Sequence, residues 1–151
     1  MRRRLRGFWG AQGGAAAVEF AAVLTPLMLM IFGVEEFGRL CWTREALQET
    51  ATAAARCMAM SSTSCASGGS YSSDSTNTYI IAQATNWGLT LTTSNITLTR
   101  STATTCGGVS ATKGFSNVSL TYNFVSAIPH LSTGVQGGES LTTTSCFPNY
   151  S

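Results

Sequence analysis

The chain has few ionisable side chains. Aspartate, glutamate, lysine and arginine make up 11% of its 151 residues, and His130 is the single histidine. After residue 60 the acids are Asp74 and Glu139, and the basic side chains are Arg100 and Lys113. In the sequence these residues follow no acid–base or nucleophilic-triad pattern. We therefore expect a protein that is not an enzyme and has no catalytic residues.

Short motifs that hold metals or phosphates are missing as well. The five cysteines include no Cys-x-x-Cys pair, although zinc sites commonly use that spacing. Two glycine pairs, residues 107–108 and 137–138, lack the lysine of a phosphate-binding loop and are predicted to form turns. We expect neither a metal site nor a cofactor.

The net charge of +2 comes from the first few residues. Arg2, Arg3, Arg4 and Arg6 are four of the nine basic residues, and the other five are outnumbered by seven acidic residues. Basic residues ahead of an apolar run orient that run with its N-terminus in the cytoplasm. The charge pattern therefore predicts a membrane topology and argues against nucleic acid as a partner.

An apolar run follows this basic leader. Residues 15–34 number 20, close to the length that crosses a hydrocarbon core of about 30 Å, and Glu19 is their single charge. A cleaved secretory signal has its small residues after the apolar run, whereas Ala15, Ala16 and Ala17 stand at its beginning. We expect a membrane span in contact with lipid. An uncleaved anchor would explain its length but not Glu19, because a carboxylate there costs about 2 kcal/mol or more unless it is paired or snorkels.

Gly14, followed by four residues and then by Glu19 and Phe20, resembles the processing site of type IV pilins and pseudopilins. The downstream runs 34–40, 46–48 and 54–56 resemble the TadE-like pseudopilins of tight-adherence (Flp) pilus systems. This resemblance implies a bacterial inner-membrane protein with a periplasmic head. It also implies that prepilin peptidase cuts between Gly14 and Ala15, and that other pilins, pseudopilins and the assembly machinery are partners.

Glu19 has a physical role that agrees with this resemblance. A carboxylate among packed helices can pair with the α-amino group of Ala15 in a neighbouring subunit, and the pair offsets the desolvation of both charges. We expect the attraction to set the axial register of subunits. The alternative is a side chain that snorkels to the cytoplasmic headgroups. Glu35, at the far end of the span, can pair with Arg39 one turn later.

The helix is predicted to continue to about residue 60. Over residues 15–60 it would be roughly 69 Å long, with Pro26 and Gly33 as local weak points. Beyond the membrane, side chains at spacings of three and four predict a face that packs on the head and in part contacts neighbouring subunits. They are Phe37, Leu40, Cys41, Arg44, Leu47, Gln48, Ala51, Ala54, Ala55 and Met58. We expect Cys41 to be buried on this face, with a bridge between subunits as the alternative.

A small α+β head is predicted for residues 61–151. Residues 61–74 indicate a serine-rich surface loop, and residues 79–87 a short helix that ends at Gly88. Its inward side chains would be Ile80, Ile81, Ala84 and Trp87. Alternation and threonine content predict antiparallel strands over 95–100, 115–125 and 139–146. The sheet should pack against the long helix, as in a type IV pilin.

Cysteine number suggests how so small a core is reinforced. In an oxidising periplasm Cys57, Cys65, Cys106 and Cys146 can form two disulfides, and the sequence allows three pairings. We favour Cys57 with Cys65, which closes the serine-rich segment, and Cys106 with Cys146, which ties parts of the sheet together.

Together these features indicate a minor pseudopilin with a leader at 1–14, a helix at 15–60 and a head at 61–151. Whether it enters the extracellular fibre, caps it or starts its assembly is left open by the sequence. Two other interpretations also remain: an uncleaved, membrane-anchored periplasmic scaffold or binding module, and a pseudopilin of a related secretion system.

Overall fold

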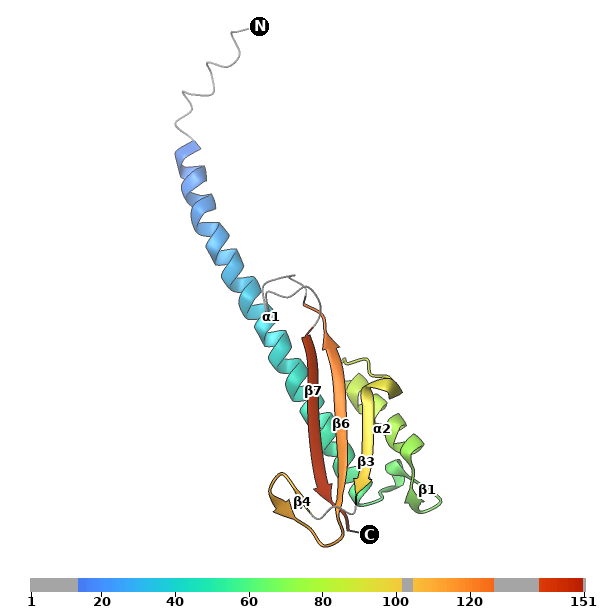
Figure 1. Ribbon diagram of the computed structural model, residues 1–151. Helices are drawn as coiled ribbons and strands as arrows, with labels where there is room; N and C mark the ends of the chain where they lie inside the picture. The colour runs from blue at the N-terminus through green and yellow to red at the C-terminus, as the bar shows by residue number, and fades with distance from the viewer. Residues whose placement is uncertain (1–13, 102–104, 127–138, 151) are drawn as a thin grey trace, which may run out of the picture.

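A computed structural model describes residues 14–101, 105–126 and 139–150. Residues 1–13, which include the arginines of the leader, lie outside the described residues, as do His130 and the glycine pair 137–138. One long helix, α1 (Gly14–Ala59), extends well beyond a small head made of a second helix and antiparallel strands (Figure 1). The predicted α+β arrangement is confirmed.

The end of α1 is closed by a hydrogen-bonded cap. The amide of Ser62 donates to the carbonyl of Cys57 at 3.2 Å, and the amide of Ser61 donates to that of Met58 at 3.1 Å. This is the Schellman pattern, which needs a left-handed residue just past the helix, and Ser61 supplies it with φ of 45°. The cap satisfies carbonyls that would otherwise lack partners and turns the chain back towards the head.

The C-terminal half of α1 contributes the largest share of the core. Ten of the buried residues in this half are Thr43, Ala46, Leu47, Thr50, Ala51, Ala54, Ala55, Cys57, Met58 and Ala59. The predicted inward face was right from Leu47 onward in its apolar members but wrong for Phe37, Cys41, Arg44 and Gln48, which are exposed. The true face includes Thr43 and Thr50. These threonines can be buried because their hydroxyls donate to the carbonyls of Arg39 and Ala46, one turn back.

The main sheet has three antiparallel strands in the order β3, β6, β7, where β3 is Ile96–Ser101, β6 is Phe115–Phe124 and β7 is Glu139–Pro148. In its register Leu120 lies between Ile96 on β3 and Thr143 on β7. Alternate residues of β6 are buried, among them Val118, Leu120 and Phe124. These side chains share one core with residues of α1 and α2, so both helices cover the same face of the sheet.

The second helix, α2 (Ser73–Asn86), begins six residues earlier than the sequence pattern predicted. Its first turn is polar, but the side chain of Ser72 accepts a hydrogen bond from the amide of Ser75 and caps the helix. Ile80 and Ala84 are fully buried as predicted, and Ile81 is partly buried. Trp87 was predicted to point inward, which is wrong: it is 38% exposed.

Several short elements were not predicted. The segment read as a loop contains the 3-10 helix η2 (Thr63–Cys65) and the hairpin of β1 (Ala66–Ser67) and β2 (Ser70–Tyr71). A second 3-10 helix, η3 (Thr93–Asn95), precedes β3, and β4 (Thr105–Cys106) pairs with β5 (Val109–Ser110). The predicted turn at residues 107–108 is present, with both glycines at positive φ.

The β1–β2 hairpin packs against the end of the sheet. The guanidinium of Arg100 lies 5.5 Å from the ring centre of Tyr71. Burial raises the pKa of the Tyr71 phenol above its ordinary 10.0, although the charge of Arg100 acts in the opposite direction. The phenol is therefore neutral at physiological pH, and its ring serves as packing surface for the hairpin.

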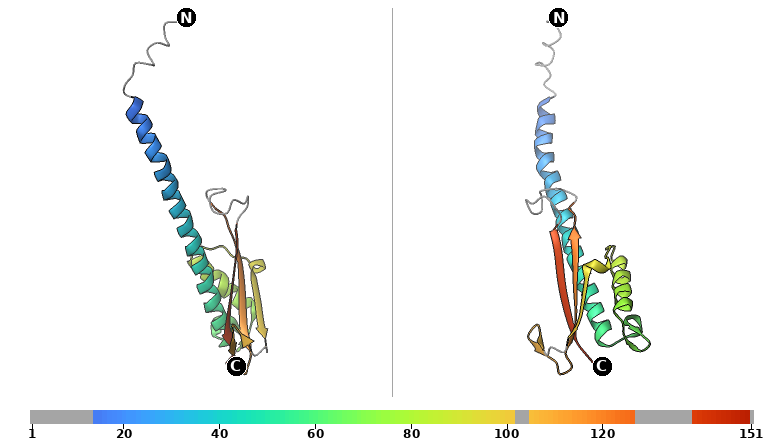
Figure 2. Two further views of the ribbon diagram at one scale, coloured as in Figure 1. Left: turned by 60° about the vertical axis from the view of Figure 1, so that its left-hand side comes forward. Right: turned by 45° about the vertical axis from the view of Figure 1, so that its right-hand side comes forward.

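Four cysteines are joined in the two pairs favoured above. Cys57 is bonded to Cys65 with 5.9 Å between their Cα atoms, and Cys106 to Cys146 with 6.6 Å. The first pair fastens the end of α1 to η2, and the second fastens the β4–β5 hairpin to β7. Figure 2 shows that hairpin at the edge of the sheet, away from α2. Each bridge thus attaches a short peripheral element to α1 or to the main sheet.

Removing the two bridges should destabilise the head unequally. The bridges span 8 and 40 residues. Chain-entropy arithmetic for loops of those lengths gives about 2.5 kcal/mol for Cys57–Cys65 and about 4 kcal/mol for Cys106–Cys146. Urea unfolding of the full chain in detergent, with serine replacing both cysteines of one bridge at a time, measures this order. The Cys41→Ser variant is the control and should unfold like the unmodified protein.

Candidate assembly surface

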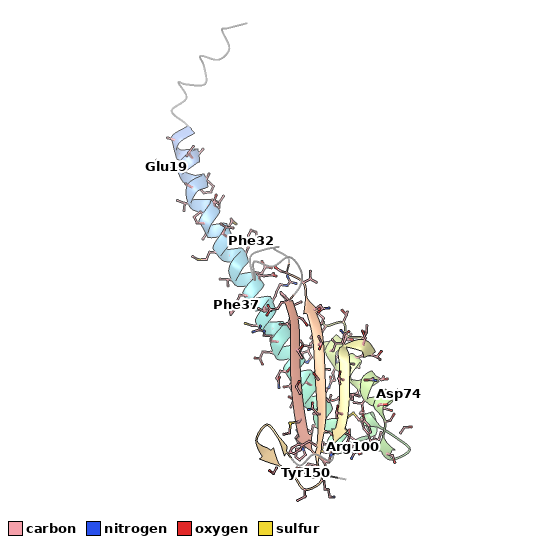
Figure 3. All side chains as sticks on the ribbon, viewed as in Figure 1. Glu19, Phe32, Phe37, Asp74, Arg100 and Tyr150 are labelled. Carbon is pink, nitrogen blue, oxygen red and sulfur yellow. A yellow bond between two sulfur atoms is a disulfide. The ribbon has the colours of Figure 1, made fainter. Side chains whose placement is uncertain are left out.

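The N-terminal half of α1 has no packing partner within the described head. The 18-residue apolar window in this helix has a mean hydropathy of 2.1, and none of it is buried. Large side chains including Val18, Phe20, Val23, Met30 and Val34 are each more than two-thirds exposed. Figure 3 shows this half, from Glu19 to Phe32, standing clear of the sheet. By length and composition, α1 is long and apolar enough to cross a membrane.

Glu19 lies on this exposed surface. It is five residues from the start of α1, and within the described residues it forms no ion pair. Its carboxylate is separated from Ala15 by one helical turn, or about 6 Å along the axis. The residues next to it in the sequence, including Val18 and Phe20, are apolar. A charge in this setting needs a partner that the described part of the chain does not supply.

Gly14 is not required by the fold. It has helical backbone geometry, and a Cβ atom placed on it would meet no atom within 4 Å. Gly88, in contrast, has φ of 77° at the end of α2, where an L side chain would be strained. Packing and backbone strain therefore do not explain the glycine at position 14, next to Ala15.

Pro26 interrupts the hydrogen bonding of α1 in its apolar half without ending the helix. Proline has no amide hydrogen, so the carbonyl of Ala22 lacks its usual partner. One residue earlier, the hydroxyl of Thr25 donates to the carbonyl of Ala21 at 2.8 Å. A proline in a membrane-length helix is tolerated where neighbouring helices or polar side chains serve the freed backbone group.

A polar seam joins α1 to β7. Arg44 donates to Glu139 at 3.1 Å, Gln48 accepts from the hydroxyl of Thr143, and Ser145 donates to Thr52 at 3.3 Å. The helix residues of the seam are spaced four apart, so they lie on one face of α1.

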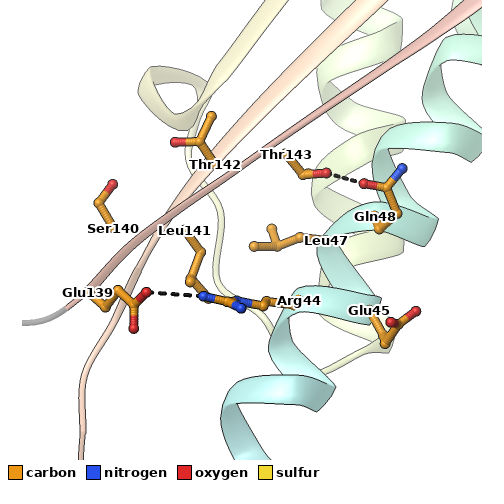
Figure 4. Close-up of a pocket in the computed structure, with 9 residues that line it drawn as sticks. All are labelled: Arg44, Glu45, Leu47, Gln48, Glu139, Ser140, Leu141, Thr142 and Thr143. Atoms are coloured by element: carbon orange, nitrogen blue, oxygen red, sulfur yellow. Dashed lines mark hydrogen bonds and ion pairs between the residues drawn. The ribbon is translucent and has the colours of Figure 1, made fainter. Parts of the chain in front are cut away.

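A groove of about 420 Å³ opens along this seam, with Leu47 and Leu141 among its lining residues (Figure 4). Its lining holds carboxylates and a guanidinium but neither histidine nor cysteine. The groove therefore offers charged hydrogen-bonding groups and no nucleophile–base pair. We interpret it as the solvated border between helix and sheet.

A second groove, of about 530 Å³, lies where α1, the end of α2 and the end of β6 converge. The rings of Trp42 and Trp87 meet edge to face, with centroids 5.5 Å apart. Arg39 lies 5.5 Å from the centre of the Phe124 ring. Trp42 is 58% exposed, so this groove is an open aromatic surface.

Two predictions for the region just after the apolar half were wrong. Arg39 pairs with Glu36 at 3.0 Å, three residues away, rather than with Glu35. Glu36 is 5% exposed whereas Glu35 is exposed, and the buried carboxylate has the stronger need of a cation. Cys41 is an exposed free thiol, not a buried core residue. It points outward because the threonine-containing face of α1, rather than the face of Phe37, turns to the sheet.

Residues 14–56 match the family model described as TadE-like protein. The N-terminal helix is TadE-like. The match covers α1 from its first residue to Arg56, within three residues of its end, and does not extend into the head. No curated protein and no solved structure matches the chain.

The TadE-like match covers 43 of the 151 residues, which is less than half of the chain. It also coincides with the part of the molecule whose surface is uncovered. The described head residues contain no cluster of three or more histidine, cysteine or acidic side chains that could hold a metal.

The exposure of Cys41 makes it the thiol that reagents should reach. The other four cysteines are in disulfides, so a water-soluble maleimide should label the folded protein once, at Cys41. Peptide mass mapping without reduction identifies the labelled residue. Labelling at another cysteine, or no labelling until denaturant is added, would contradict the described orientation of α1.

Proposed function

We propose that this protein is a minor pseudopilin that acts in assembly of a tight-adherence pilus. One observation carries the proposal. The N-terminal half of the TadE-like helix is long enough to cross a membrane, its apolar window is not buried in the head, and its one charge is the carboxylate of Glu19. Exposed apolar surface of this extent is unfavourable in water and marks a contact with lipid or protein. A pseudopilin uses one such surface for both contacts.

The same half of α1 suits two surroundings. In the inner membrane the 20-residue apolar run 15–34, with Glu19 as its one charge, spans about 30 Å and contacts lipid tails. In an assembly the tails are replaced by helices of other subunits, which are equally apolar and exclude water. When the helix moves from the membrane into an assembly, it therefore exchanges contacts with lipid tails for contacts with apolar helices. The interactions that distinguish the two states must then come from polar groups.

Glu19 is the polar group that can distinguish them. Cleavage after Gly14 creates a positive α-amino group on Ala15, one turn away from the Glu19 carboxylate. Among packed helices the amino group of one subunit can approach the carboxylate of its neighbour, at a helix offset that the charges select. Losing one partner would leave the other charge buried and uncompensated, which is strongly unfavourable. The pair therefore favours one axial register.

The head supports a periplasmic location. Its two disulfides are a form of reinforcement that persists in oxidising compartments. The basic residues of the leader, by the positive-inside rule, favour a cytoplasmic N-terminus, and one span then puts the head on the opposite side. An uncleaved anchored scaffold would share this topology, so processing at Gly14 separates the two interpretations.

Processing should depend on Gly14. In cells that contain prepilin peptidase, the isolated protein should begin at Ala15, and in cells that lack it the protein should begin at Met1. The Gly14→Leu variant should keep its leader because a bulky side chain blocks the cut. N-terminal sequencing and intact mass measure this.

The control is Gly33→Leu, because Gly33 lies in the same helix with equal space around it. This variant should be processed normally. Retention of Met1 in every strain would favour the anchored scaffold.

Removal of the Glu19 carboxylate should impair assembly and spare insertion. Glu19→Ala should enter the membrane fraction at the normal level, because the span becomes more apolar, while pili become fewer or absent. Immunoblots of membranes and of sheared pili measure the two effects. Glu35→Ala, at the exposed far end of the span, is the matched control and should assemble normally. Normal piliation of Glu19→Ala would remove the register role.

A further inference from the structure

The second groove holds an aromatic cluster that the pilus contacts of the apolar half do not use. We define the interfacial cluster as Trp42, Trp87, Phe124 and Arg39. Trp42 lies in α1 and Trp87 is the C-cap residue of α2; their rings meet edge to face, and both are exposed on one side. We propose that this cluster rests in the headgroup layer of the periplasmic leaflet, and that phospholipid is its binding partner. The proposal rests on the membrane insertion assumed in the proposed function.

The height of the cluster along α1 fits that layer. Trp42 is eight residues beyond Val34, the end of the apolar run, or about 12 Å along the axis. A long helical side chain covers the turn N-terminal to its own Cα, which brings the indole to about 7 Å from the run. The headgroup layer is roughly 5 to 7 Å thick on each side of the hydrocarbon core. The indole ring of Trp42 therefore reaches lipid headgroups without entering the acyl chains.

The rest of the head brings Trp87 to the same level. α2 ends, and β6 ends, at the end of the head nearest the apolar half of α1 (Figure 1). Leu89, next to Trp87 in the groove, is 5% exposed and forms part of the core. The cluster therefore borders the buried core through Leu89.

The chemistry of the cluster suits a boundary between lipid and water. An indole combines a large apolar ring with one N–H donor, and tryptophan is enriched at membrane interfaces for that reason. Within the described residues, neither the Trp42 nor the Trp87 indole donates a hydrogen bond in the head. Arg39 lies over the Phe124 ring in the same groove; it is paired with Glu36, but its side chain is 48% exposed and its remaining N–H donors can reach a phosphate. With α1 as one anchor and Trp87 as another, the head would be held at a defined angle to the membrane.

Tryptophan fluorescence in single-copy nanodiscs tests this placement. Trp9 is replaced by phenylalanine in every sample, so that Trp42 and Trp87 are the emitters. With phosphatidylcholine bearing a headgroup nitroxide, the emission should lose most of its intensity, and aqueous iodide should have little effect. Single Trp42→Phe and Trp87→Phe variants show which ring contributes. One copy per disc ensures that no second subunit covers the cluster.

A distal reporter provides the matched control. Tyr150 is 64% exposed and lies at the end of the head farthest from Glu19 (Figure 3). With Trp42 and Trp87 both changed to phenylalanine, Tyr150→Trp should be quenched by iodide and not by the headgroup nitroxide. If Trp42 and Trp87 behave like this reporter, the lipid contact is refuted.

Three outcomes distinguish failure of the lipid contact from failure of the proposed function. Protection of Trp42 and Trp87 from both quenchers would mean that protein covers the cluster. A chain that fails to float with vesicles would lack the membrane insertion itself, which removes the proposed function as well. Flotation with normal iodide quenching at the cluster would refute the lipid contact alone and leave the pseudopilin role intact.

Discussion

The apolar surface of α1 that the head does not cover is the constraint on which the rest of the molecule depends. Apolar area in contact with water costs about 25 cal/mol per Å², so an uncovered run of large side chains must be inserted in lipid or packed on other helices. This requirement separates α1 into two functional halves. The first half has no packing partner among the described residues, and the second half is the surface on which the head packs.

The second half meets a different demand, because the head is small and its core is correspondingly limited. Alanines at positions 46, 51, 54 and 55 let the sheet and α2 approach α1 closely, and Leu47 and Met58 fill the space between them. Polar contacts along the α1–β7 seam and two disulfides at the periphery supplement this core. Surface ion pairs such as Arg44–Glu139 contribute little individually, so the bridges have the larger role. A rigid head in turn presents Trp42 and Trp87 together.

Prediction from sequence succeeded where one local signal governs the structure. The three main strands were found because β6 alternates apolar and polar residues and β7 is rich in threonine. The start of α2 was misplaced because its first turn has no apolar periodicity. That turn is stabilised instead by the cap of Ser72. The rotation of α1 between residues 37 and 50 was also misjudged. Thr43 and Thr50 count as polar in a periodic pattern. In a helix, however, their hydroxyls donate to backbone carbonyls one turn back, so these side chains can be buried.

The sequence by itself determined the membrane-length apolar run 15–34, its single charge at Glu19, the glycine before the run and the cysteines available for bridging. These are properties of neighbouring residues, and their consequences need no distant partner. Tertiary structure alone decided which side of α1 faces the sheet, that Glu36 rather than Glu35 holds Arg39, and that Trp42 meets Trp87. Those outcomes depend on contacts between residues far apart in the chain or on small rotations of one helix, and burial selects among them only when the whole head is packed.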